Sequence, residues 1–271
     1  MSFILNYGNQ GVWYGTFSSF PNELVNHAIS TRFGGISESP FHHMNLAMHN
    51  GDNIEKVIHN RKIFCNSIGM NSDELVTAEQ IHGDTIVYVS KNDIGKGSKS
   101  YADAIKTTDA LITNCKNIPL MLFFADCVPV IIVDPINKAI GVSHAGWKGT
   151  VKKIAQKTVL AMGQKFNTRS QDCLIGIGPS IGSCCYEVDH GVVKEFEQSF
   201  GEDANAFIKP SNDKWTLDLW MANKLQLIEI GIKPENIDSS NICTACNSKM
   251  FFSYRADQGK TGRIAAVISL K

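Results

Sequence analysis

The chain has 271 residues, with 26 Lys and Arg against 26 Asp and Glu, so its formal net charge at pH 7 is zero. A neutral chain lacks the overall positive field that attracts nucleic acid or an anionic membrane, so an anionic substrate must be bound by a few local cations. Hydrophobic residues make up 43% and charged residues 19% of the sequence, which is typical of one large or two small globular α/β domains.

The sequence predicts a cytoplasmic protein. Its first segment, MSFILNYGNQ, has no basic region before its apolar residues, which argues against a signal peptide. The longest apolar run, around 120–133, is too short to span a bilayer and contains Asp126 and Pro129. We therefore expect the eight cysteines to be reduced, most of them as small buried hydrophobic residues.

Short strands are expected within residues 1–30, and the first helix is predicted over 53–70. Its apolar residues share one face with the period of an α-helix: Ile54, Val57, Ile58, Phe64, Cys65 and Ile68. Arg61 lies on that same face, which leaves two interpretations. Either Arg61 lies at the edge of the face with its charged end in water, or it points into a polar site under the helix.

Strands and helices alternate in the middle of the chain. A loop rich in Gly, Lys and Ser is predicted to be mobile over 91–103. The other expected elements are strands at 84–90, 121–135, 138–147, 173–182 and 262–270, and helices at 150–166, 191–200 and 216–232. This order indicates a mixed α/β fold and not a regular doubly wound sheet.

Asp126 and Cys127 interrupt the apolar run at 121–135, and His82 and His144 lie near the ends of neighbouring segments. Two imidazoles and a thiolate suit a catalytic zinc with one open position, which activates water or polarises a substrate oxygen. The alternative is a buried cysteine with two hydrogen-bonded core histidines. Because side chains alternate along a strand, we expect Asp126 to face away from Cys127 and to orient a ligand histidine or pair with an arginine.

Cys243 and Cys246 form a C-x-x-C motif near the C-terminus. A structural zinc would need a second cysteine pair, and the adjacent Cys184 and Cys185 have poor spacing for that role. The sequence therefore favours reduced thiols near a turn.

The segment FFSYRADQGKTGR contains Arg255, Lys260 and Arg263. It fits either a basic surface loop or a clamp for an oxyanion such as phosphate. The segment GIGPSIG lacks the G-x-G-x-x-G spacing and contains a proline, so it is predicted to be a turn and not a phosphate loop.

Seven segments occur in the order found in one known family: NLAMHNGDN…VIHNR, EQIHG, DALIT, FFADCVPV, SHAGWKGT, GIGPSIGSCCYEV and FFSYRADQGKTGR. The chain thereby resembles the YfiH-like proteins, also called the laccase-domain or polyphenol-oxidase family, from STRFGG to the C-terminus. The resemblance implies a single domain over 1–271 with a layered α/β/β/α fold. It also implies a metal site formed by His82, Cys127 and His144.

Members of this family are described as purine nucleoside phosphorylases that act on adenosine, inosine and S-methyl-5′-thioadenosine and also deaminate adenosine. The leading hypothesis is therefore a zinc enzyme whose substrates are purine nucleosides and phosphate, with no nucleic-acid or membrane partner, acting as a monomer or homodimer. His82, Cys127 and His144 are its expected catalytic residues. The expected substrate-binding residues are Arg61 and Asn45 first, then Arg255 and Arg263 for phosphate, with Gln80 and Asp126 to orient the nucleophile or transfer a proton.

Three alternatives stay open at this point. The eight histidines include no H-x-H pair, which argues against multicopper chemistry, although a single copper ion remains an alternative to zinc. The chain would instead be a Cys-His amide hydrolase if Cys127 were the nucleophile and His82 or His144 its base. The third alternative is a zinc-stabilised binding module without catalysis.

Overall fold

The computed structural model describes residues 3–271, and its strands form three sheets. The first sheet has the strand order β1 (Phe3–Tyr7), β2 (Trp13–Phe17), β3 (Val25–Ser30), β15 (Ile264–Leu270), β7 (Leu120–Phe124) and β4 (Val76–Thr77). The second has the order β14 (Ile237–Ser239), β10 (Leu174–Ile177), β8 (Val128–Asp134), β9 (Ala139–Ala145), β6 (Ala110–Thr113) and β5 (Ile86–Tyr88). The third is small, in the order β11 (Glu187–Val188), β13 (Lys214–Leu217) and β12 (Ile208–Ser211).

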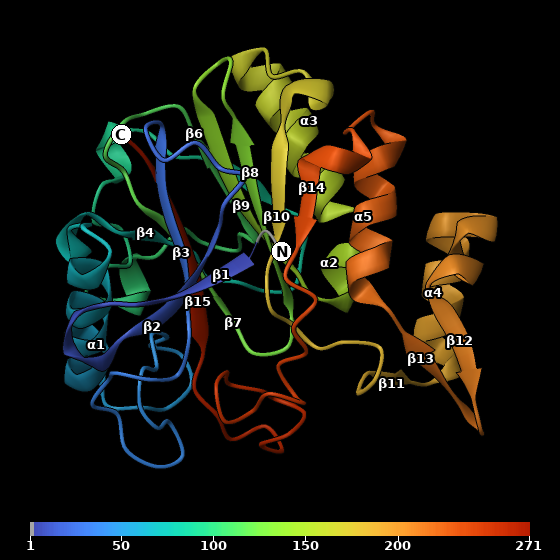
Figure 1. Cartoon of the computed structure of the whole chain (residues 1–271), viewed down its shortest axis with the longest axis horizontal. Coiled ribbons are helices and arrows are strands. Elements are labelled where there is room, and N and C mark those ends of the chain that lie inside the picture. Colours follow the sequence, from blue (N-terminus) through green and yellow to red (C-terminus); the bar gives the residue numbers. More distant parts are fainter. Residues whose placement is uncertain (1–2) are drawn as a thin grey trace.

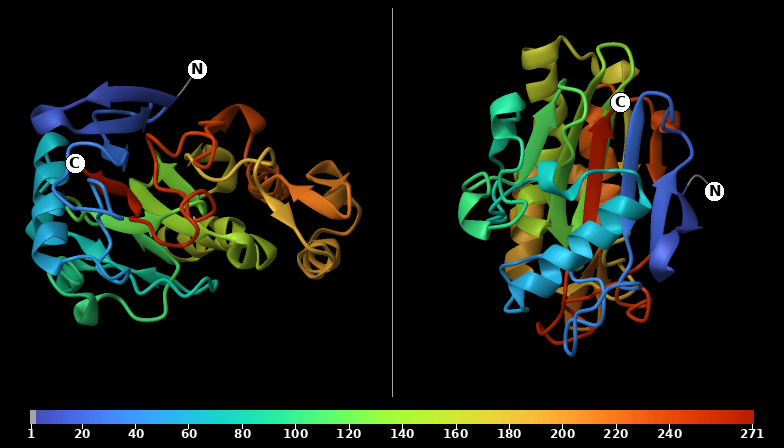
Figure 2. Two further views of the ribbon diagram at one scale, coloured as in Figure 1. Left: turned by 90° about the horizontal axis from the view of Figure 1, so that it is seen from below. Right: turned by 90° about the vertical axis from the view of Figure 1, so that its left-hand side faces the viewer.

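The two large sheets lie face to face between layers of helices (Figure 1). The α-helices are α1 (Ile54–Ser67), α2 (Trp147–Val151), α3 (Ile154–Phe166), α4 (His190–Phe200) and α5 (Leu219–Glu229). The views of Figure 2 place α1 outside the first sheet and α3 and α5 outside the second. Helix α4 and the small sheet project at one end. The fold is therefore the mixed, layered α/β/β/α arrangement expected, while its description as one domain over 1–271 stays a prediction.

Alternation along the central strands explains these layers. In β7, Leu122 and Phe124 pack between the two sheets, whereas Met121 and Phe123 face the core under α1. In β8, Ile131 faces the inter-sheet core. A strand that is buried on both faces is apolar at nearly every position, and β7, β8, β9 and β15 are buried throughout. Their charged or polar exceptions are Asp134, Ser143, His144 and Ser269.

Most predicted elements are confirmed, with several differences. The apolar run at 121–135 is two strands, β7 and β8, which belong to different sheets. The helix predicted over 150–166 is divided into α2 and α3, because Lys153 adopts a left-handed conformation with φ 57°. The strands β4, β6, β11, β12, β13 and β14 were not predicted.

The loop at 91–103 is bound to the core, in contrast to the expectation of mobility. It contains two short 3₁₀ helices, η3 (Lys91–Asp93) and η4 (Tyr101–Asp103), and Ser90 and Asp93 form a capping box at the first of them. The carbonyl oxygens of Gly97 and Ser98 accept hydrogen bonds from the buried Arg61 guanidinium at 2.6 and 2.9 Å. The remaining 3₁₀ helices are η1 (Asn9–Gly11), η2 (Ser72–Glu74), η5 (Ser170–Asp172), η6 (Gly201–Ala206) and η7 (Pro234–Asn236).

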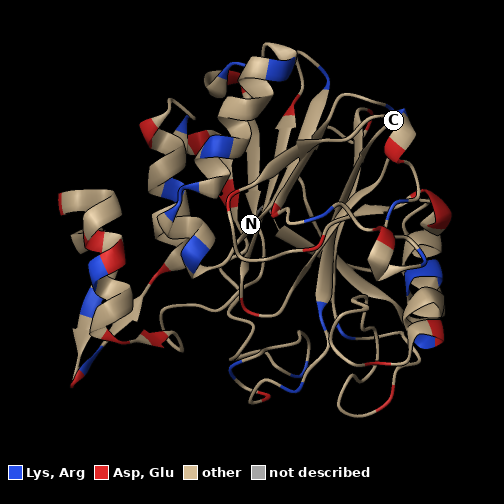
Figure 3. Cartoon of the chain, turned by 180° about the vertical axis from the view of Figure 1, so that it is seen from behind, with Lys and Arg blue, Asp and Glu red and all other residues tan. Residues whose placement is uncertain are grey.

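Within residues 3–271, every helix is too short or too polar to cross a bilayer. Lysine and arginine residues are interspersed with acidic residues along the helices in Figure 3. Because opposite charges are mixed in this way, the cations that could bind an anion must be sought at individual sites.

His27 on β3 makes acid stability a testable property of the fold. Its side chain is buried and its Nε2 accepts the Phe17 N–H at 2.8 Å, and burial lowers its pKa from 6.5 to about 4. Since the unfolded chain then binds the proton more tightly, this contribution to stability is complete above pH 6.5 and is lost as pH falls toward 4. We expect a loss of about 2 kcal/mol between pH 7.5 and pH 5, measured by urea unfolding.

The control for this prediction is His27→Gln, which keeps a hydrogen-bond acceptor but does not titrate. The variant should lose that part of the pH dependence while other groups continue to titrate. An unchanged difference in unfolding free energy between the two pH values would contradict the assignment to His27.

Candidate functional site

Cys127 lies in a tight turn at the point where the chain passes from the first large sheet to the second. Residues 125–127 connect β7 to β8, and Asp126 in this turn has φ 80°. Asp126 and Cys127 are therefore not neighbours on a strand, and the argument from strand alternation was wrong. The turn itself exposes both side chains to one cavity.

His82 and His144 meet Cys127 from two other segments. His144 lies in β9, where its register partner is Pro129 of β8, while His82 lies in the loop between β4 and β5. The ligand atoms of the three residues all lie within 4.8 Å of one another, and His82 Nε2 is 3.8 Å from Cys127 Sγ. Gly146 is needed beside them, because a Cβ there would lie 2.9 Å from Cys127 Sγ.

Asp109 holds both histidines in place, and the sequence interpretation missed it. One carboxylate oxygen lies 2.8 Å from His144 Nδ1, and the carboxylate also accepts the backbone N–H groups of Ile81, His82 and Gly83 at 3.2, 3.0 and 2.7 Å. Burial raises the pKa of Asp109, but the bond from His144 and the backbone donors outweigh burial and lower it. A carboxylate directly before the buried strand β6, in the DALIT segment, was the available signal.

The two histidines also lower the pKa of the Cys127 thiol. Burial raises the pKa of its thiol, but the positive charge and hydrogen bond of His144 and the hydrogen bond of His82 outweigh burial and lower it to about 6. Burial in turn lowers the pKa of His144, yet the Cys127 thiolate and Asp109 raise it to about 9. The pair is therefore a thiolate and an imidazolium near neutral pH, unless a metal cation takes the place of the proton.

The three residues fit one tetrahedral metal ion. Ordinary Zn–N and Zn–S bond lengths place the two donor atoms of a tetrahedron about 3.6 Å apart, close to the separation of His82 Nε2 and Cys127 Sγ. Because Asp109 occupies Nδ1 of His144, Nε2 is left as the ligand atom. The donor set also leaves a fourth position for substrate or water. Two nitrogens and one sulfur suit both zinc and copper.

A cavity of about 550 Å³ opens in front of the three residues, within the range typical of small-molecule sites. Four of the predicted substrate-binding residues lie in its wall, and two do not. The residues that line it are His49, Gln80, His82, Phe123, Ala125, Asp126, Cys127, His144, Trp147, Ile181, Tyr186, Leu219, Tyr254, Arg255 and Arg263.

Arg61 lies inward from its helix, but not in this cavity. Only 2% of the residue is exposed, and its guanidinium donates to the carbonyl oxygens of Leu46, Gly97 and Ser98. It also lies over the Phe123 ring, 4.8 Å from the centroid. These contacts give Arg61 a structural position under the 91–103 loop, which corrects the expectation that it binds phosphate.

Asn45 is likewise removed from the cavity. It is fully buried, its Nδ2 donates to Asp52 Oδ2 at 2.9 Å, and its Oδ1 accepts the backbone N–H of Arg263 at 2.9 Å. Asn45 therefore positions the Arg263 backbone and does not meet a substrate directly.

Gln80 and Asp126 line the cavity with their polar groups already bonded. The Gln80 amide makes two hydrogen bonds with the backbone of Phe123, at 2.9 and 2.8 Å. The Asp126 carboxylate accepts Thr244 Oγ1 at 2.6 Å and the backbone N–H of Arg255 at 2.7 Å. Asp126 thus meets the backbone and not the guanidinium of an arginine, and the role of orienting a ligand histidine belongs to Asp109.

Arg255 and Arg263 bring positive charge to the cavity wall. Arg255 donates to the carbonyl oxygens of Cys185 and Glu187 at 3.0 and 3.1 Å. Arg263 donates from Nη1 to the carbonyl oxygens of Thr261 and Gly262, and burial lowers its pKa despite the opposing effects of Cys127, Tyr254 and Asp126. The FFSYRADQGKTGR segment is therefore part of the site, at least through these two side chains.

The sequence interpretation also missed the aromatic and histidine residues of the wall. His49, from the NLAMHNGDN segment, lies 5.4 Å from the Tyr101 ring and lines the cavity, as do Phe123, Tyr186 and Tyr254. These residues come from separate loops and from a strand, so no local spacing marks them as one site. The result is a layered α/β protein with a candidate three-ligand metal site in a pocket with aromatic walls.

Comparison with known proteins gives the family. The family model described as multi-copper polyphenol oxidoreductase laccase matches residues 26–271. The chain is 38% identical over 253 residues to the purine nucleoside phosphorylase YlmD of Bacillus subtilis, covering 92% of this chain and 90% of that protein. This chain therefore belongs to the laccase-domain, or YfiH-like, family, several curated members of which are named purine nucleoside phosphorylase.

Solved structures agree with this assignment over nearly the whole chain. YlmD from Geobacillus stearothermophilus matches with a TM-score of 0.94 at 34% identity, covering 99% of each chain. The hypothetical protein YfiH of Bacillus licheniformis matches with a TM-score of 0.93 at 35% identity, covering 98% of this chain and 99% of the other.

The family description and the residues of this chain differ in one respect. A multi-copper oxidase needs several histidine-rich sites. Residues 3–271 contain two groups of three or more side chains that could hold a metal ion. One is the set His82, Cys127 and His144, and the other consists of four cysteines. The chain thus offers one histidine-containing site that suits a single ion.

Proposed function

We propose that this protein is a zinc-dependent purine nucleoside phosphorylase. It would act on inosine, adenosine and S-methyl-5′-thioadenosine with phosphate, and release the free base and the corresponding ribose 1-phosphate. One observation supports this most: the three-ligand site, aromatic walls and two arginines share one cavity, in a chain related to curated purine nucleoside phosphorylases. The cytoplasm is its proposed location.

The reaction defines what the chain must do. A phosphate oxygen forms a bond to C1′ of the ribose, the bond from C1′ to the purine nitrogen breaks, and the purine leaves with the electron pair and takes up a proton. Arg263 and Arg255 are the proposed phosphate ligands, because a guanidinium fork matches phosphate oxygens. Phe123, Tyr186 and Tyr254 offer flat apolar surfaces for the purine ring.

His82, Cys127 and His144 would hold the metal, with Asp109 fixing the orientation of the His144 imidazole and the position of the His82 backbone. A zinc ion bound there would supply a Lewis acid for a substrate oxygen or lower the pKa of water. The proposal includes the deamination of adenosine to inosine, in which water replaces the amino group at C6 and ammonia leaves. Copper is the alternative ion for the same ligands.

Arg263→Gln tests the phosphate-binding role. Loss of a charged hydrogen-bond donor should raise the KM for phosphate by about 10- to 100-fold, with zinc content unchanged. Initial rates of hypoxanthine release from inosine at varied phosphate concentration measure this effect. Lys260→Gln, an exposed cation of the same segment, is the matched control and should leave the phosphate KM unchanged. A wild-type rate that does not depend on phosphate would instead contradict phosphorolysis.

The geometry also supports a second candidate, a Cys-His amide hydrolase. Cys127, His144 and Asp109 lie in the order thiol, imidazole and carboxylate, which is the order of groups in an activated nucleophile. The two candidates differ in their response to a chelator. Chelation should abolish phosphorolysis by the zinc enzyme, whereas it should preserve or reveal amide hydrolysis if Cys127 is the nucleophile.

A further inference from the structure

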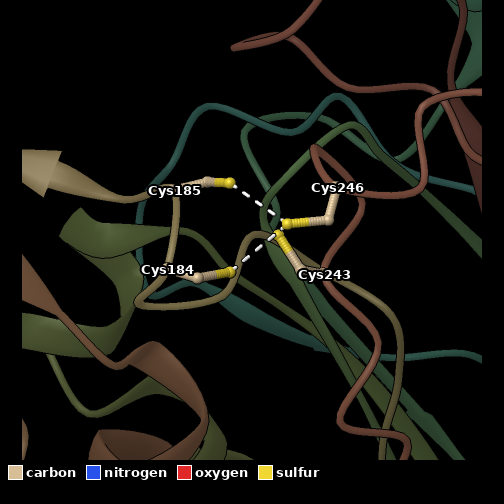
Figure 4. Close-up of side chains that lie close together, drawn as sticks. All are labelled: Cys184, Cys185, Cys243 and Cys246. Atoms are coloured by element: carbon tan, nitrogen blue, oxygen red, sulfur yellow. Dashed lines mark hydrogen bonds between the residues drawn. The ribbon is translucent and has the colours of Figure 1, made fainter.

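Four cysteines that do not belong to the three-ligand site come together in the structure. Cys184 and Cys185 lie in the loop between β10 and β11, and Cys243 and Cys246 lie in the loop between β14 and β15. Strands β10 and β14 are parallel neighbours, so the loops that follow them leave the sheet at the same edge. Figure 4 shows that the four side chains point toward one another from the two loops.

The sulfur positions fit a single tetrahedral metal ion. All four sulfur atoms lie within 4.8 Å of one another, and Cys246 Sγ is 3.5 Å from Cys184 Sγ and 3.4 Å from Cys185 Sγ. Zinc–sulfur bonds of ordinary length place the sulfurs of a ZnS₄ tetrahedron about 3.8 Å apart. The thiols are not joined as disulfides, and an iron–sulfur cluster would need wider spacing to admit its several iron and sulfide atoms.

The surroundings also suit a metal site. The backbone N–H of Gly182 points at Cys243 Sγ with a separation of 3.3 Å, a contact that stabilises negative charge on sulfur. Cys184 and Cys246 are exposed, where free thiols would be open to oxidation. Four cysteine thiolates are a common ligand set of structural zinc, because thiolates favour soft and borderline cations over hard ones. We propose that Cys184, Cys185, Cys243 and Cys246 form a second, structural zinc site that is not part of the nucleoside site.

This zinc site would stabilise two loops that contribute to the wall of the nucleoside cavity. The backbone N–H of Thr244 donates to the Ser180 carbonyl at 3.0 Å, and the Thr244 hydroxyl donates to Asp126. Arg255 donates to the carbonyl oxygen of Cys185, and Tyr186, the next residue, lines the cavity. A zinc ion between the two loops would thus fix the segments that position Arg255 and Tyr186 beside the substrate.

Metal content tests this proposal without any assay of activity. The full chain, purified with a reductant from cells supplied with zinc and then desalted, should contain two zinc ions per chain, one for each ligand group. The Cys184→Ser/Cys246→Ser double variant and Cys127→Ala should each contain one. Cys115→Ser removes a cysteine outside both groups and should retain two. With cobalt in place of zinc, Cys127→Ala should show the intense absorption of a four-thiolate ion.

Three results would overturn the proposed four-cysteine zinc site. A wild-type protein with one zinc that Cys127→Ala abolishes would overturn the second site, as would a double variant that keeps both ions. A native disulfide between Cys184 and Cys246, found by mass spectrometry of the protein purified without reductant, would also overturn it. Should the double variant fail to fold, Cys127→Ala decides the question: one zinc supports the site, and none refutes it.

Discussion

Replacing Cys127 with alanine is expected to remove the metal from the nucleoside site and to lower inosine phosphorolysis on the order of 10³-fold. The thiolate is the one anionic ligand among the three, so the two imidazoles that remain bind zinc much less tightly. Zinc content after desalting and initial rates at saturating phosphate measure the two effects. Circular dichroism should show an unchanged fold, because the substitution lies in a turn and removes a single sulfur atom.

Cys115→Ala is the control for this prediction, since Cys115 is a partly buried thiol that contacts Tyr88 and belongs to neither ligand group. It should keep the wild-type rate and metal content. If Cys127→Ala loses activity but retains all bound metal, Cys127 acts as a nucleophile and not as a ligand.

Asp109→Asn is expected to weaken zinc binding at the nucleoside site by about 10- to 100-fold, although Asp109 touches no metal. The substitution replaces one carboxylate oxygen by an NH₂ group that cannot accept hydrogen bonds. If the NH₂ group takes the place of Oδ1, the bonds from His144 and from the His82 N–H are lost. If it takes the place of Oδ2, the bonds from the Ile81 and Gly83 N–H groups are lost. Competition with a zinc-binding dye at fixed pH measures the dissociation constant.

Asp126→Asn provides a matched comparison for this result. Asp126 is a buried carboxylate of the same cavity, but it accepts from Thr244 and Arg255 and not from a histidine. Its variant should bind zinc as tightly as the wild type. Equal losses of zinc affinity in the two variants would contradict a positioning role specific to Asp109.

Local patterns in the sequence predicted much of the fold. The apolar period of residues 54–67 marks α1, and Asn53 caps it by accepting the Lys56 N–H. The apolar runs at 139–145 and 264–270 mark strands that are buried on both faces. The break between β7 and β8 could not be predicted, because it depends on which sheet each half joins. Asp126 has φ 80°, a conformation that aspartate adopts more readily than most residues, but a single aspartate in an apolar run does not mark a turn.

Site residues were predicted only in part, because the fold brings together residues that are distant in the sequence. The sequence alone left His82, Cys127 and His144 open between a zinc set and a buried core, and the family resemblance favoured zinc. Residue spacing was misleading for the cysteines, because pairing of β10 with β14 brings together loops about 60 residues apart. For Arg61 the sequence left two interpretations open, an edge position with its charge in water and an inward one. The side chain lies inward, and its partners are carbonyl groups that no sequence pattern reveals.

The central claim is that a metal ion on His82, Cys127 and His144 is required for nucleoside phosphorolysis. The most direct test is to strip the purified protein with a chelator, remove the chelator, and follow ribose 1-phosphate formation from inosine during zinc titration. We predict that the stripped protein is inactive and that activity returns in proportion to zinc bound at this site, with no recovery in Cys127→Ala. Full phosphorolysis by the protein stripped of metal would contradict the account.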